Sequence, residues 1–295
     1  MIEIQNKIRK QKNRHPIGLL LVFMICYRLT LSFLDRYWNG LLYRIGLYGK
    51  IHAYLSASGC LMLLLMVIIA LMFLSDQIYI FAQERKRLPV ALVPGMYMLC
   101  MSLLSIVTGL TGSEGFQSHR MIAYSSLYFI LVAVTEELVY RGVTADLLMQ
   151  FFLSRCNPCG NDFCDRNGRK AIWTATVCSG LIFGLAHMSN MSHADVAGVL
   201  VQMLGAFLMG MVLVAVYYRT SNIYAVIVLH AVNDLAAAMP ATILKSDQNI
   251  SDIISGYGIT ELLMMIPYAV VLLVIFRPSK LDEIWKRWNV DLNRN

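Results

Sequence analysis

The stretch MIAYSSLYFILVAVTEELVYRG, residues 121–142, joins an apolar run directly to two glutamates and an arginine. Ionisable side chains inside apolar spans cost about 3 kcal/mol each on insertion scales, and they usually face a bundle interior or a water-filled cavity. The stretch therefore predicts a transmembrane helix that carries a functional site. Other helices of the chain should then supply the partners of these charged groups.

The composition of the whole chain is that of a membrane protein. The 295 residues are 58% hydrophobic and 15% charged, whereas about 25% of residues are charged in soluble proteins. A hydrocarbon core of about 30 Å needs roughly 20 apolar residues per helix. We therefore expect an all-α, polytopic transmembrane bundle of about eight spans. Their approximate positions are 17–34, 53–75, 90–111, 121–141, 171–190, 196–218, 223–242 and 259–276.

Lysine and arginine set the expected orientation, because cytoplasmic loops carry the excess of these residues. The N-terminal tail, the 142–170 loop and the C-terminal tail are rich in them, so we expect both termini in the cytoplasm. The first apolar run is interpreted as a retained span rather than a signal peptide. The net charge of +7 is explained by loops that face anionic lipid headgroups, which leaves no need for a nucleic-acid partner.

A cysteine-containing loop raises the question of a structural metal. Cys156, Cys159 and Cys164 form CNPCGNDFC, which suggests a zinc knuckle, but no nearby histidine supplies the fourth ligand that such sites need. We expect an ordinary loop.

The first polar cluster belongs to the fourth span. Residues four apart lie on one helix face, so Glu137 can pair with Arg141, while Glu136 is rotated by about 100° and stays free of that pair. We therefore expect Glu136 to act in chemistry and the other two residues to support it.

Histidines mark two further spans. Phe183 precedes His187 by four residues in FGLAH, so its ring can pack beside the imidazole and fix it. In HAVND the same spacing places His230 and Asp234 on one face, with Asn233 as a rival for the partner role.

A carboxylate and an imidazole on neighbouring helices can take a proton from water and so direct it at a carbonyl carbon. A second histidine with Asp234 or Asn233 could then serve the developing oxyanion or the leaving amine. Only an asparagine or a protonated aspartate can donate to an oxyanion. An ionised Asp234 would instead orient His230.

Other interpretations of these residues remain open. Each cluster taken alone could be a structural polar contact between helices. Two histidines and a glutamate also describe a hydrolytic zinc centre, although the His-Glu-x-x-His helix is absent from the sequence. No serine lies in a Gly-x-Ser-x-Gly setting, so serine hydrolysis is the weakest alternative.

The ordered motifs EELVYR (136–141), FGLAH (183–187) and HAVND (230–234) resemble those of the CPBP intramembrane proteases. This family includes the CAAX prenyl endopeptidases and the bacteriocin-processing and immunity proteins called the Abi family. The resemblance implies a glutamate-dependent endopeptidase in which Glu136 and His187 activate water and His230 and Asp234 support the oxyanion. It implies no metal, and it makes Glu137 and Arg141 supporting residues. Asp234 stands where the family often has asparagine.

The resemblance also implies a substrate and a location. The substrate would be a membrane-associated or prenylated peptide, and the protein would lie in a bacterial plasma membrane among its lipids. The alternative is a non-catalytic bacteriocin-immunity or scaffold protein that retains the motifs. We expect residues 121–242 to form the catalytic core, after a basic tail and three spans in 1–120 and before a last span and basic tail in 243–295.

The depth of the site adds a structural prediction. With a rise of 1.5 Å per residue, Glu136 would lie only about 7 Å from a cytoplasmic helix end at residue 141, far from the depth of His187. We therefore expect the fourth helix to continue past Gly142 through VTADLLMQFFLSR toward Arg155.

Overall fold

The computed structural model describes residues 15–38, 41, 52–74, 86–156 and 166–293. These ranges contain no strand, only an isolated bridge between Phe116 and Leu244, so the predicted all-α class is confirmed. The elements are α2 (Pro16–Phe33), η1 (Leu34–Trp38), α4 (His52–Leu74), α5 (Leu88–Leu92), η2 (Val93–Gly95), α6 (Met96–Gly112), α7 (His119–Glu137), η3 (Leu138–Ala145), α8 (Asp146–Leu153), α9 (Arg166–Ala186), η4 (His187–Ser192), α10 (Val196–Thr220), α11 (Ile223–Thr242), α12 (Ile250–Ser255), α13 (Ile259–Ile275) and α14 (Pro278–Asn293).

Every expected span coincides with a helix or with consecutive helices. In the described ranges six helical segments are long and apolar enough to cross a membrane, and a seventh is added if the bent pair α13–α14 is one span. Helix α4 supplies a shorter apolar segment, Gly59–Leu74. The chain is thus an integral membrane protein. The number of spans and the cytoplasmic position of the termini stay predictions.

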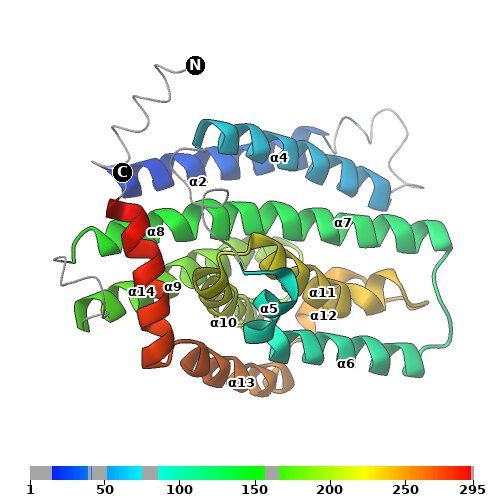
Figure 1. Cartoon of the computed structure of the whole chain (residues 1–295). Coiled ribbons are helices and arrows are strands. Elements are labelled where there is room, and N and C mark those ends of the chain that lie inside the picture. Colours follow the sequence, from blue (N-terminus) through cyan, green and yellow to red (C-terminus); the bar gives the residue numbers. More distant parts are fainter. Residues whose placement is uncertain (1–14, 39–40, 42–51, 75–85, 157–165, 294–295) are drawn as a thin grey trace.

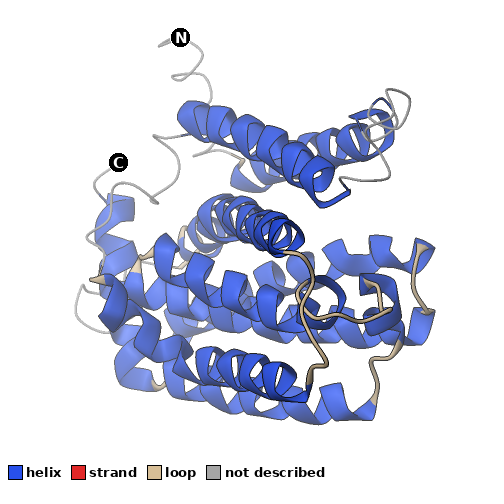
Figure 2. Cartoon of the chain, turned by 90° about the vertical axis from the view of Figure 1, so that its right-hand side faces the viewer, coloured by secondary structure: helices blue, strands red, loops and turns tan. Residues whose placement is uncertain are grey.

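Helix α10 forms the centre of the bundle. Its residues from Met209 to Tyr218 are all buried, and it packs against α9 and α13. Figures 1 and 2 show α2 and α4 together on one side of α7, with the group around α10 on the other side. The long fourth span therefore lies between these two groups of helices.

Two glycines let α9 approach α10 closely. A Cβ atom on Gly180 would lie 2.9 Å from the backbone oxygen of Phe207, and one on Gly184 would lie 2.8 Å from that of Met203. Small residues four apart allow this backbone contact between membrane helices. The contact fixes the face of α9 that carries Phe183.

The fourth span continues well past Gly142, as predicted from the depth of the site. Helices α7, η3 and α8 form one 35-residue segment, His119–Leu153. Its middle part, η3, is π-helical, and the Thr144 hydroxyl donates to the Val139 carbonyl, five residues earlier, at 3.0 Å. Short π-helical segments within α-helices are frequent at functional sites. Here the π-helical segment begins directly after the two glutamates.

The outer helices present apolar side chains as a lipid-facing surface should. On α13 the exposed large residues are Ile259, Leu263, Met264, Ile266, Val270, Leu273 and Val274. The segment that follows was expected only as a basic tail. It folds as α14, bent by 67° from α13, and lies across the ends of other helices in Figure 1.

Candidate active site

The end of α7 places the two glutamates in different surroundings. The Glu137 side chain is fully buried, and its Oε1 lies 2.8 Å from Nη1 of Arg141, which is also fully buried. This is the ion pair expected from the spacing of four residues. The Glu136 side chain is 25% exposed and is not part of that pair.

His230 of α11 joins the carboxylates from two helices. Its Nδ1 lies 2.6 Å from Oε1 of Glu137. Its Nε2 lies 3.3 Å from Oδ2 of Asp234 and 3.8 Å from Oε2 of Glu136. The His230–Asp234 contact was expected from helical spacing. The contact with Glu137 was not, because spacing within one helix carries no information on contacts between helices.

Asn233 points elsewhere. Its Oδ1 accepts a hydrogen bond of 3.5 Å from the Ser102 hydroxyl of α6. Of the two rival residues, Asp234 is therefore the one that contacts His230, and Asn233 joins α11 to α6.

His187 begins η4, directly after α9 ends. Its Nδ1 lies 3.1 Å from the backbone oxygen of Phe183. Because a carbonyl only accepts hydrogen bonds, Nδ1 must carry the proton in this contact. The Nε2 atom of a neutral ring is then left with its lone pair, which is the form a general base requires.

Phe183 lies at the junction of these groups. Its side chain is buried, and its ring centroid is 5.2 Å from that of His187 and 5.6 Å from that of His230, in edge-to-face contacts. The Arg141 guanidinium lies 4.5 Å from the same centroid, and the Tyr140 ring lies 4.9 Å from it. The expected contact with His187 is present, and Phe183 also separates the two imidazoles and supports the arginine.

The site divides into two halves by exposure. We call Glu137, Arg141, Phe183 and His230 the inner half, since none is more than 2% exposed. We call Glu136, His187 and Asp234 the outer half. Side-chain exposure is 25% for Glu136 and 21% for Asp234, and His187 is half-buried. Water and a substrate can reach only the outer half.

The sequence left two zinc alternatives open, one at the glutamate and the histidines and one at the cysteine loop. Among the residues the structure describes, no three side chains of His, Cys, Asp or Glu converge as metal ligands would. The Cys156 thiol donates to the Phe152 carbonyl at 3.5 Å, and Cys159 and Cys164 lie outside the described residues.

Comparison with known proteins finds a family model that matches part of the chain. The model described as type II CAAX prenyl endopeptidase Rce1-like matches residues 118–236, a segment that contains every site residue named above. No curated protein and no solved structure matches the chain. The resemblance drawn from the three motifs is confirmed by this match.

Proposed function

Because residues 118–236 belong to the CPBP/CAAX protease family, we propose that the protein is a glutamate-dependent intramembrane endopeptidase. The general base is assigned from the contrast between the two glutamates. Glu137 is fully buried beside Arg141 and His230, whereas Glu136 is partly exposed. A general base must reach the proton that it removes, so Glu136 is the residue that can contact water.

The proposed reaction begins at Glu136 and His187. The Glu136 carboxylate, with the free Nε2 of His187, takes a proton from water while the water oxygen bonds to the carbonyl carbon of the scissile peptide. The carbonyl becomes an oxyanion in a tetrahedral intermediate. When the C–N bond breaks, the proton passes to the leaving amine, which yields a free carboxylate and a free amine.

The oxyanion is served by His230 and Asp234 in this proposal. The Nδ1 atom of His230 is held by Glu137, so only Nε2 can turn toward a substrate, and it donates only when it carries a proton. Asp234 contacts that same nitrogen. In its ionised form it orients the ring, and in its protonated form it can donate to the oxyanion itself.

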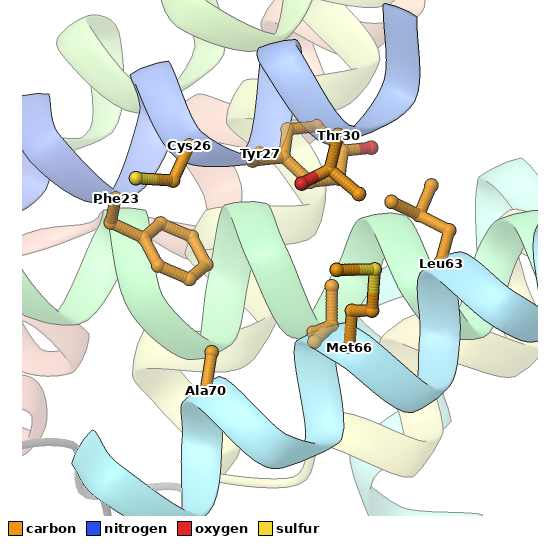
Figure 3. Close-up of a pocket in the computed structure, with 8 residues that line it drawn as sticks. Phe23, Cys26, Tyr27, Thr30, Leu63, Met66 and Ala70 are labelled. Atoms are coloured by element: carbon orange, nitrogen blue, oxygen red, sulfur yellow. The ribbon is translucent and has the colours of Figure 1, made fainter. Parts of the chain in front are cut away.

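The proposed substrate is a membrane-associated peptide with a lipid modification such as a prenyl group. A cavity of about 190 Å³ between α2 and α4 supports this choice, since its lining is almost wholly apolar: Phe23, Cys26, Tyr27, Thr30, Leu63, Met66, Val67 and Ala70 (Figure 3). The Tyr27 ring of that lining contacts the Tyr140 ring edge to face, with 6.3 Å between the ring centroids. The Tyr140 ring in turn packs on Phe183. The cavity is thus joined to the site by three successive rings.

The base assignment is tested by Glu136→Gln, which keeps size and hydrogen bonding but removes the base. We expect cleavage of a farnesylated CAAX peptide by purified protein to fall at least about 100-fold. The matched control is Glu114→Gln, which removes a carboxylate from an exposed loop residue and should leave the rate unchanged. Undiminished cleavage by Glu136→Gln at equal protein level contradicts the proposal and favours a non-catalytic immunity or scaffold role.

Two variants on α4 test whether the cavity binds the lipid group of the substrate. Ala70→Phe would fill the cavity, and Ile69→Phe adds a ring at the neighbouring position, which is 54% exposed. We expect the first to slow cleavage of the farnesylated peptide more than that of the unmodified peptide. The second should affect neither, and equal rates for Ala70→Phe and the unaltered protein contradict this role of the cavity.

We propose that no metal takes part, and that the membrane is a bacterial plasma membrane. Protein treated with a chelator should keep its full cleavage rate. A loss of activity that zinc restores would instead assign the two histidines and Glu136 to a metal centre.

A further inference from the structure

Helix α14 packs against the bundle through one face of its described side chains, residues 278–288. Its buried residues Leu281, Ile284, Trp285 and Trp288 follow the spacing of an amphipathic helix. Because α14 is bent by 67° from α13, it crosses the ends of neighbouring helices and does not run beside them (Figure 1).

Polar contacts fix α14 to the C-terminal end of α10. The Trp288 indole donates to the Tyr218 carbonyl at 3.3 Å. The Arg287 guanidinium donates to the Arg219 carbonyl at 2.7 Å and to the Ser221 hydroxyl at 3.3 Å. Arg287 thus caps the end of α10, where a cation is favoured.

Lys86 is held at the same helix end through its backbone. Its N–H donates to the Thr220 carbonyl at 3.0 Å, and its own carbonyl accepts from the Asn222 side chain at 2.7 Å. The chain segment that enters α5 is thereby attached to the turn between α10 and α11. The Lys86 side chain is directed toward α14, where its Nζ lies 3.9 Å from Glu283.

Among the described residues, positive charge gathers at this point around the carboxylate of Glu283. We call Lys86, Arg219, Lys280 and Arg287 the basic cluster. Lys280 also pairs with Glu283. Burial lowers the pKa of Lys86. Among the described residues Glu283 raises this pKa, whereas Arg287, Arg219 and Lys280 lower it further. In the described part of the chain, Glu283 is the carboxylate that faces Lys86 and Lys280.

Helix capping accounts for only part of the basic cluster. Arg287 reaches a carbonyl of α10, but the ammonium groups of Lys86 and Lys280 contact Glu283. In addition, the buried Nε of Arg219 has no hydrogen-bond partner among the described residues. The cluster therefore keeps positive charge and donor capacity that the protein does not use.

The position of the basic cluster points to the chemistry of its ligand. Lys86 lies just before the span Leu88–Gly112, and Arg219 lies at the end of the span Val196–Thr220. Apolar spans end at the headgroup layer of a bilayer. A ligand there must carry negative charge and sit at the edge of hydrocarbon.

We propose that the basic cluster binds the phosphate of an anionic phospholipid and that α14 lies in the interface beside it. Arginine and lysine at the membrane surface attract anionic lipid, and guanidinium and ammonium groups both bind phosphate oxygens. Next to Lys86 the apolar side chains of Leu88 and Val90 are exposed. A soluble phosphate would meet the same donors but would gain nothing from these side chains.

The test uses the full chain and phosphatidylglycerol as probe, with retained lipid counted by native mass spectrometry. The double variant Lys86→Gln/Lys280→Gln removes two cations but keeps the Arg287 cap. At about 1 kcal/mol per cation, retention should weaken about 30-fold. The control Arg120→Gln/Lys245→Gln removes two exposed cations near the other end of α7 and α11, and it should retain the lipid.

A second variant tests the site without loss of a cation. Glu283→Gln removes the competing carboxylate and should strengthen retention of phosphatidylglycerol, whereas phosphatidylcholine should bind weakly to every variant. Equal retention by the cluster variant and the unaltered protein overturns the proposal, as does equal loss in the control. Displacement of the lipid by inorganic phosphate would assign the site to a soluble anion. None of these outcomes depends on peptide cleavage.

Discussion

The inner and outer halves of the site differ in what surrounds the same kinds of side chain. Glu137 and Glu136 are neighbours in sequence, yet one is fully buried between a guanidinium and an imidazole and the other is 25% exposed. The two histidines differ in the same sense, because His230 contacts three carboxylates and His187 contacts a backbone carbonyl. Burial therefore separates the groups that hold the geometry from those that can meet a substrate.

The largest effect on stability is expected in the inner half. Arg141→Met should lower the free energy of unfolding by about 3–5 kcal/mol, because it leaves the Glu137 carboxylate buried without its cation. Chemical unfolding in detergent would measure this loss. The double variant Glu137→Gln/Arg141→Met should recover part of it, and a loss below about 1 kcal/mol in the single variant would show that the pair does not hold the site together.

In the outer half the effect should fall on rate and not on stability. His187→Asn keeps a donor for the Phe183 carbonyl but lacks Nε2, so peptide cleavage should drop about 100-fold or more with the unfolding midpoint unchanged. Steady-state cleavage and thermal unfolding of the same preparation would measure both. A stable variant with undiminished cleavage would remove His187 from the proposed chemistry.

Substitutions of Asp234 should lower the cleavage rate less, and they distinguish two roles of this side chain. Asp234→Asn retains the shape and adds an amide donor for an oxyanion, so we expect activity to stay within about 10-fold, whereas Asp234→Ala should lose about 100-fold. Cleavage rates of the two variants give the comparison. If the asparagine variant is as inactive as alanine, the carboxylate acts by orienting His230.

The smallest expected effect concerns the π-helical segment. Thr144→Val removes the hydroxyl that reaches the Val139 carbonyl, which should cost about 1 kcal/mol of unfolding free energy. Chemical unfolding measures it, with Thr174→Val on α9, whose exposed hydroxyl bonds Lys170 four residues back, as a control expected to cost less.

Much of this architecture could be predicted from hydropathy and helical spacing. Apolar length located each expected helix, and spacings of four gave the contacts of Glu137 with Arg141, of Phe183 with His187 and of His230 with Asp234. Each of these contacts lies within one continuous helical segment, which local geometry decides. The matched segment contains all of them.

Contacts between helices could not be predicted in this way. Neither the bond from Glu137 to His230 nor the central place of Phe183 follows from spacing, because both depend on how α7, α9 and α11 pack. The close approach allowed by Gly180 and Gly184 had a signal in the sequence, two glycines four residues apart. Helix α14 was missed because its charged residues conceal a buried face of two tryptophans, a leucine and an isoleucine.

The π-helical segment η3 makes the fourth span sensitive to the number of residues that it contains. A π turn accommodates one residue more than the α-helix on either side, so α7 and α8 face directions that depend on that surplus. Removing one residue between 138 and 145 would let this segment form an ordinary α-helix. It would also swing Asp146 away from the Tyr217 hydroxyl, its partner at 3.2 Å. A one-residue deletion there should thus be tolerated worse than any single replacement of the same residues.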